Sequence, residues 1–206
     1  MVHGEAKVNH LLAVRNLEVK ILEHLQILNV EPCVETKSYI VVSWIPPPPN
    51  VVKMNVDAAL VGTEATLAAV ARDSSRTIFN CWTKRLPTFD PCIVEATAIL
   101  WSLELAQVIG LPNVEVEGDA KICFEAIMVE NAETPWRILS IISNVKLLAL
   151  KFSSCSFCWV RGDANDVAYS LAKCASSQPL SVSYNSTNLP FSIHEAWLRF
   201  ASFGLI

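Results

Sequence analysis

Four consecutive prolines, Pro46–Pro49, are the feature that most limits how this chain can fold. Proline lacks a backbone N–H and has a fixed φ, so the run predicts a stiff, extended connector rather than a helix or a central strand. The segment VVKMNVDAA at 51–59 follows at once and reads as a β-strand. Lys53, Asn55 and Asp57 fall on one face of that strand. We therefore place the start of the main domain at the prolines.

Asp57 is the residue of this strand that most needs an explanation. Acidic residues are depleted in strands. A carboxylate in the middle of a strand is also costly unless it is solvated, paired or bound to a cation. Asp57 therefore marks a candidate functional position.

Composition limits the class of protein. With 206 residues and 52% hydrophobic content, the chain is long and apolar enough for one sizeable domain. Its net charge of −4 provides no global basic field for nonspecific nucleic-acid binding. Seven cysteines, an odd number, indicate reduced thiols and an intracellular location, in the nucleus or cytoplasm. No apolar run approaches the roughly 20 residues of a membrane span, so no membrane partner is expected.

Periodicity and turn signals predict an α/β fold, with a mixed sheet covered by helices. Asp90-Pro91 is a strong helix start, because Asp is a preferred N-cap and Pro suits the first helical position. Gly110 and Pro112 then end that helix. The remaining elements are expected as strands at 65–71, 77–86, 113–119 and 152–161 and as helices at 120–129, 135–150 and 164–175.

The sequence divides into three parts. Residues 1–45 form an extension and linker, in which Val8–Val30 has the rhythm of an amphipathic helix and is a candidate docking site for a protein partner. Residues 46–176 form the main domain. Residues 177–206 form a tail that is expected to be loop-like up to a short helix at 193–203. Nothing in the pattern defines an oligomeric state.

Three acids are placed where their side chains can converge: Asp57, Glu95 and Asp119. If the strand at 113–119 lies beside the strand at 51–59, Asp57 and Asp119 are neighbours, and Glu95 reaches them from the helix between. Close carboxylates raise one another's pKa unless a cation lies among them. Hard oxygen ligands favour Mg²⁺ or Mn²⁺. Such a site is typical of phosphodiester hydrolysis by a two-metal route.

Simpler interpretations of the same acids stay open at this point. Asp119 precedes a helical segment, where it is also a good N-cap. Glu95 is also explained as a surface residue that interacts favourably with a helix N-terminus. Spacing alone does not decide between these interpretations and a metal site.

Five short motifs occur in one order along the chain, namely Lys53–Ala59, Val70–Asp73, Val94–Ala98, Val114–Asp119 and Asn165–Lys173. This set resembles the ribonuclease H type-1 superfamily, specifically the plant reverse-transcriptase-like form derived from non-LTR retrotransposons. The lead-in Trp44-Ile45-Pro46-Pro47 is similar to that form as well. The resemblance covers about Trp44–Ala175.

The resemblance implies a ribonuclease H-like fold with a five-stranded mixed sheet and helices on both faces. It also implies an RNA–DNA hybrid as substrate and Mg²⁺ (or Mn²⁺) as cofactor. Asp57, Glu95 and Asp119 occupy the positions of the first three catalytic acids. Tyr169 stands where active members have the fourth, and a phenol with a pKa of about 10 is a poor ligand for a hard metal. Asp166, three residues earlier on the same helical face, is the expected substitute.

Two further departures from the family pattern concern histidine and glycine. No histidine lies between His24 and His194, so the proton-shuttling histidine of many members is missing. Asp163, near the place of that histidine, is a second candidate to replace the fourth acid. Ala58 and the segment 67–69 replace glycines that let nucleic acid approach closely. Two hypotheses follow: a metal-dependent hybrid ribonuclease, or a catalytically degenerate module that binds nucleic acid or protein.

Cysteines and tryptophans receive structural interpretations. Cys155 and Cys158 form a CxxC, but an offset of three within a strand points the thiols to opposite faces, and no second ligand pair completes a zinc site. Trp101, Trp136 and Trp159 are interpreted as packing residues in or near the core.

Basic residues cluster around the expected second hairpin. Arg72, Arg76, Lys84 and Arg85 all lie in or beside it. They are placed either to meet phosphates or to form an ordinary solvated hairpin. The sequence does not decide between these two interpretations.

Overall fold

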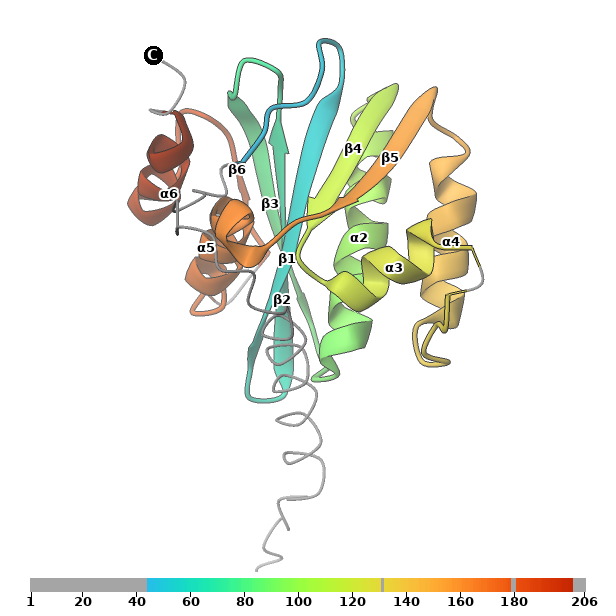
Figure 1. Ribbon diagram of the computed structural model, residues 1–206. Coiled ribbons are helices and arrows are strands. Elements are labelled where there is room, and N and C mark those ends of the chain that lie inside the picture. The colour runs from blue at the N-terminus through green and yellow to red at the C-terminus, as the bar shows by residue number, and fades with distance from the viewer. Residues whose placement is uncertain (1–43, 131, 179–180, 202–206) are drawn as a thin grey trace, which may run out of the picture. The chain divides into compact units, whose positions relative to one another are not determined.

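The computed structural model describes residues 44–130, 132–178 and 181–201, with side chains up to residue 199 (Figure 1). All of these residues fall within one compact unit, residues 41–206. The docking helix expected at Val8–Val30 lies outside the described residues.

A six-stranded mixed sheet forms the centre of this unit, with the strand order β5-β4-β1-β2-β3-β6 (Figure 1). Neighbours β1, β2 and β3 are antiparallel, whereas β4 is parallel to β1 and β5 is parallel to β4. The expected α/β fold with a mixed sheet is confirmed. The strands are β1 (Val52–Val61), β2 (Glu64–Arg72), β3 (Ile78–Leu86), β4 (Asn113–Gly118), β5 (Ser154–Trp159) and β6 (Ser183–Tyr184).

The sixth strand was not expected from the sequence or from the resemblance, which implied five. β6 has only two residues and pairs antiparallel with Cys81 and Trp82 of β3. A strand this short has no detectable alternation, so the tail reads as a loop in the sequence. It covers part of the edge that β3 would otherwise expose.

Helices cover both faces of the sheet (Figure 1). One face packs against α2 (Pro91–Val108), α3 (Lys121–Met128) and α4 (Leu139–Ala149) around a core that includes Met54 and Val56 of β1. The other face packs against α5 (Asp166–Ala175) and α6 (Phe191–Ala201) through a second core that includes Ala68 and Val70. A short 3-10 turn, η1 (Gly162–Ala164), leads into α5.

The start of α2 confirms the predicted cap. One carboxylate oxygen of Asp90 accepts hydrogen bonds from the backbone N–H groups of Cys92 (3.1 Å) and Ile93 (3.2 Å), and Pro91 is the first helical residue. The other oxygen pairs with Arg137 at 2.7 Å. The Asp90 carboxylate thus pairs two N–H groups that have no partner within the helix, and its negative charge interacts favourably with the helix dipole. Together these interactions fix where α2 begins.

Within the described residues, α2 is also the one helix long and apolar enough to cross a membrane by length and composition. Its apolar residues have another role here. Val94, Ile99 and Leu103 are fully buried in the core against the sheet. A core helix passes the same test as a membrane span, and α2 is a core helix in this structure.

Two predictions about side-chain environments were wrong. Trp136 is 83% exposed rather than packed, because α4 begins at Leu139 and leaves Trp136 in the preceding turn. Arg72 is 1% exposed and cannot meet a phosphate. β2 extends to Arg72, which pairs with Lys53 of β1. The Arg72 side chain lies on the same buried face of the strand as that of Val70, two residues earlier. Sequence reasoning had instead assigned Arg72 to the polar turn.

Candidate metal centre

Asp57 lies in β1 with its side chain on the α5 side of the sheet and is 5% exposed. Its Oδ2 is buried and has no hydrogen-bond partner among the described residues. Burial, and then repulsion by the Asp119 carboxylate, raise the pKa of Asp57 to about 8, although a backbone hydrogen bond from Ala58 acts in the opposite direction. A buried carboxylate with an unpaired oxygen is unstable in its charged form without a cation.

Asp119 follows directly after Gly118, the last residue of β4, which runs parallel to β1. Burial raises the pKa of Asp119, and a hydrogen bond from the Asn165 side chain opposes this shift. The alternative in which Asp119 caps the next helix is excluded. The N-cap of α3 is Ala120, without a side-chain cap, and only the backbone oxygen of Asp119 bonds to Lys121 (2.8 Å).

Asn165 links the two strands that carry these acids. It is 1% exposed, and its amide nitrogen donates to the backbone oxygen of Val56 at 2.8 Å and, more weakly, to Oδ1 of Asp119 at 3.4 Å. Sequence reasoning recorded Asn165 within a motif but gave it no role. Nothing in the sequence distinguishes a buried amide from an exposed one. The place of Asn165 in that motif was therefore the only feature of the sequence that could have indicated its role.

Trp159 and Gly162 complete the surroundings of Asp119. The indole N–H of Trp159, the last residue of β5, donates to the backbone oxygen of Asp119 at 3.0 Å. A methyl group added to Gly162 would lie 3.2 Å from Oδ2 of Asp119, so glycine leaves this oxygen room. Asn165 thus holds one carboxylate oxygen while space remains beside the other.

Glu95 lies one turn into α2 and is half-buried. The helix packs against β1, as the sequence argument required. The role of Glu95 as the third metal ligand stays a prediction.

The two candidates for a fourth ligand differ in environment. Asp166 is the first residue of α5, and its Oδ2 pairs with Arg199 of α6 at 3.2 Å. Tyr169 is 51% exposed, and the ammonium of Lys173 lies 5.6 Å from the centre of its ring. The carboxylate expected to replace the missing fourth acid is therefore already engaged by a cation, and its role as a ligand stays a prediction.

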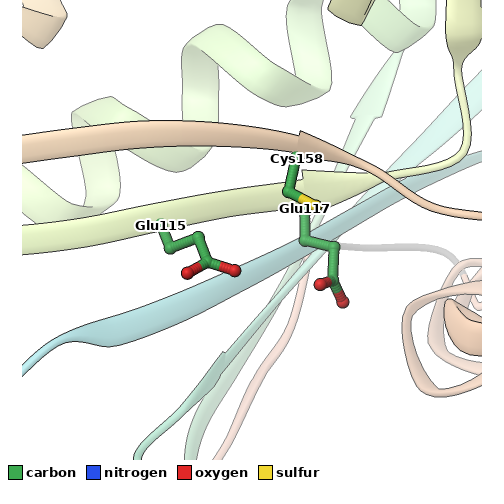
Figure 2. A group of neighbouring side chains, drawn as sticks. All are labelled: Glu115, Glu117 and Cys158. Atoms are coloured by element: carbon green, nitrogen blue, oxygen red, sulfur yellow. The ribbon is translucent and has the colours of Figure 1, made fainter. Parts of the chain in front are cut away.

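A second acidic group lies further along the same face of the sheet (Figure 2). Glu115, Glu117 and Cys158 each offer a ligand atom within 4.8 Å of the others. The ammonium of Lys53, however, lies 2.8 Å from Glu115 Oε1 and 2.7 Å from Glu117 Oε2. Burial and the two glutamates raise the pKa of the Cys158 thiol, which disfavours the thiolate that metals bind. A lysine therefore already neutralises this cluster.

Lys53 and Glu117 belong to a larger buried polar network. Asn55 donates to Glu117 Oε1 at 2.7 Å and accepts from Arg72 Nη2 at 2.6 Å. The Arg72 guanidinium stacks on the ring of Trp44 at 3.7 Å, and burial lowers the pKa of Arg72 to about 9. Through these contacts Trp44, two residues before the prolines, is fixed to the sheet, which defines where β1 begins.

The residues around Asp57 fit a hard divalent cation. Two buried carboxylates repel one another there, and Asp57 Oδ2 lacks a partner among the described residues. Carboxylate oxygens are the ligands that Mg²⁺ and Mn²⁺ prefer. Unlike the glutamates beside Lys53, this pair has no ammonium within ion-pair distance in the described part of the chain.

A mixed sheet with this strand order, helices on both faces and an acid pair at β1 and β4 defines a ribonuclease H-like domain. Among solved structures, RNase H1 from the halophilic archaeon Halobacterium salinarum matches with a TM-score of 0.55 at 20% identity, over 61% of this chain and 97% of that one. LC11-RNase H1, isolated from compost by a metagenomic approach, matches with a TM-score of 0.55 at 16% identity, over 61% and 95%. These similarities establish the fold.

A family model described as reverse transcriptase-like matches residues 55–175. The chain therefore belongs to the reverse transcriptase-like family. A search of curated proteins finds no match.

Proposed function

We propose that this protein is a metal-dependent nuclease that hydrolyses the RNA strand of RNA–DNA hybrids. Mg²⁺ or Mn²⁺ would be held by Asp57, Glu95 and Asp119, with Asp166 as the fourth carboxylate. The observation that carries the proposal is the Asp57–Asp119 pair. Both carboxylates are desolvated, they repel one another, and Oδ2 of Asp57 is unpaired among the described residues.

The protein groups around the pair would orient it for catalysis. Asn165 holds Oδ1 of Asp119, and Trp159 holds the backbone of the same residue. The other oxygen, beside Gly162, is left with room for a ligand. When bound, divalent ions supply a nucleophilic water and stabilise the leaving oxygen of a phosphodiester. Ligands that are held before binding lose little freedom, which favours precise placement of the substrate phosphate.

The substrate and the lineage form the finer part of the proposal. Membership of the family and the ribonuclease H-like fold support a hybrid as the nucleic acid. The Trp44-Ile45-Pro46-Pro47 lead-in supports a plant, non-LTR retrotransposon-derived origin. An intracellular site of action, in the nucleus or cytoplasm, is consistent with the finding that none of the cysteines in the described residues forms a disulfide.

A cleavage assay tests this function. The purified full chain is incubated with an end-labelled RNA–DNA hybrid in Mg²⁺, in Mn²⁺ and in EDTA. We expect cleavage in either metal, none in EDTA, and none from Asp57→Asn. Glu95→Gln should lose activity, whereas its control Glu104→Gln, an exposed acid on the same helix, should not.

Two results would contradict the proposal. Undiminished cleavage by Asp57→Asn would show that the site lies elsewhere. Binding of the hybrid without cleavage in either metal would instead support the degenerate module, in which the fold recognises nucleic acid and Tyr169 replaces a required carboxylate.

A further inference from the structure

α4 buries one side and exposes an apolar stripe on the other. Ile142 and Val145 face the core, where the helix packs mainly on α2. The stripe consists of Trp136, Leu139, Ser143, Leu147 and Leu150, whose four large side chains are between 55% and 83% exposed. Spacings of four residues place Leu139, Ser143 and Leu147 on one side of α4. Trp136 lies in the turn that leads into α4, and Leu150 at its C-terminal cap.

The order of residues in this stripe is symmetric about Ser143. A leucine lies four residues away on either side, at 139 and 147, and a large apolar residue lies seven away on either side, at 136 and 150. Two copies of the helix that cross antiparallel at Ser143 therefore place Leu139 of each copy against Leu147 of the other. Trp136, in the turn before the helix, and Leu150, at its C-terminal cap, flank this contact. The small serine at the centre lets the backbones approach closely.

We propose that the α4 stripe is the contact surface of a homodimer, in which a second copy of this chain packs antiparallel about a two-fold axis through Ser143. A self-complementary patch is what a two-fold interface requires, because each residue i that contacts j must also be contacted by it. Apolar patches of this extent on a protein surface commonly mark contact sites.

The area available fits a weak dimer. One tryptophan side chain buries about 150–250 Å² and dominates the stripe. Together with the leucines and the stems of the flanking residues, two stripes bury roughly 800–1,000 Å² in total, near the lower limit for specific interfaces. Because buried area does not by itself determine affinity, the dissociation constant has to be measured.

The charges near the stripe also permit the pairing. From residue 134 to residue 153 the chain has no acid, and its basic residues are Arg137, Lys146 and Lys151. Arg137 is neutralised by Asp90. Lys146 faces Ser140 of the other copy, and the two Lys146 residues are about 9 Å apart along the axis, close to the screening length of physiological salt. The residual repulsion is therefore reduced by salt, so the dimer should tighten as ionic strength rises.

A charge exchange tests both the dimer and its register. Sedimentation equilibrium of the full chain should show concentration-dependent dimerisation. Leu147→Glu alone and Leu139→Lys alone should each weaken it about tenfold or more, because a charge then lies among apolar side chains. The double variant should recover most of the affinity, because each new lysine faces a new glutamate of the other copy. The control Phe191→Glu, at an equally exposed apolar residue of α6, should leave dimerisation unchanged.

Crosslinking provides a second readout. Ser143→Cys should form a disulfide-linked dimer under mild oxidation, because this residue meets its own copy at the axis. Ser140→Cys, one residue outside the stripe, should not, since it faces Lys146. Peptide mapping separates these links from native cysteines.

Each contrary outcome overturns the proposal. A monomer at all concentrations would show that no second copy binds the stripe. Failure of the double variant to recover would exclude the Ser143-centred register. If Leu147→Glu weakens hybrid binding while mass is unchanged, and binding falls with added salt, the stripe contacts nucleic acid instead.

Discussion

The side-chain amide of Asn165 donates a 2.8 Å hydrogen bond to the backbone oxygen of Val56, although 109 residues separate the two. Val56 immediately precedes Asp57, so this bond fixes α5 against the strand that carries the first acid. The same nitrogen lies 3.4 Å from Asp119. One buried amide thus controls the relative positions of both acids.

We predict that Asn165→Ala loses about 1–3 kcal/mol of stability, because it leaves a buried carbonyl without its donor. Urea unfolding measures this loss. Asn113→Ala is the control, since Asn113 also donates to a backbone oxygen, that of Asn50, but at an exposed position, and it should change stability by less than about 0.5 kcal/mol. Equal effects of the two substitutions would show that Asn165 has no special positioning role.

Asp57→Asn should stabilise the metal-free protein in a pH-dependent way. The folded pKa is about 8, whereas an unfolded aspartate titrates near 3.9. A raised folded pKa makes the protein most stable below about pH 4, and stability is lost as pH rises through about 8. The substitution removes this loss, so it should add several kcal/mol at about pH 8 and almost nothing at about pH 4. Unfolding series at both pH values measure this gain in stability. If Asp57→Asn stabilised the protein only at the acidic pH, the pKa of Asp57 would be lowered rather than raised.

Gly162→Ala should weaken metal binding without unfolding the protein. The new methyl group would lie 3.2 Å from Asp119 Oδ2, tighter than ordinary contact, so the carboxylate must shift. Since Gly162 is exposed, stability should change by less than about 1 kcal/mol. Titration calorimetry with Mn²⁺ should show several-fold lower affinity. Ser154→Ala, at an exposed and uncharged residue of β5, is the control, and an identical affinity in both variants would argue against a ligand at this oxygen.

Tyr169→Asp should raise the rate of the proposed metal-dependent hybrid cleavage, because it supplies a carboxylate at the position where the resemblance places the fourth acid. An increase of about tenfold corresponds to about 1.4 kcal/mol of barrier. Tyr169 is 51% exposed, so the substitution should be tolerated. Tyr169→Asn controls for loss of the ring. Single-turnover rates in Mg²⁺ compare the two; no difference between them would support Asp166 as a fourth carboxylate that is already in place.

Lys53→Met should be strongly destabilising, by about 3–5 kcal/mol, because it leaves the buried carboxylate of Glu117 without its cation. Lys121→Met, which removes an exposed pair with Glu125, should cost less than about 1 kcal/mol. Adding Glu117→Gln to Lys53→Met should recover part of the stability. No recovery would mean that Lys53 acts through packing rather than charge.

The backbone elements near the site were predictable from the sequence because their signals are local. Alternation identified β1, the Asp90-Pro91 pair identified the start of α2, and the ordered motifs identified the family. The unpredicted features depend on contacts between distant segments. Asn165 is important because Val56 is adjacent to it in space. Arg72 is buried because β2 extends one residue further than the sequence indicates.

Trp136 and β6 were also not predicted, because their environments depend on neighbouring elements rather than on local sequence. Whether a tryptophan is covered depends on where the neighbouring helix begins, and a boundary is the least certain part of a periodic pattern. A two-residue strand has no pattern of its own and forms only because the edge of β3 is available to pair with it.

The buried network of Lys53, Asn55, Arg72 and Glu117 lies on the same sheet face as Asp57 but shares no hydrogen bond or ion pair with it among the described residues. Substitutions in this network and substitutions at Asp57 should therefore act separately, the first on stability and the second on the proposed cleavage. A descendant that lost cleavage could vary Asp57 freely, and would even gain stability, while its network residues stayed fixed. The pattern of drift among descendants would then record which of them still cut nucleic acid.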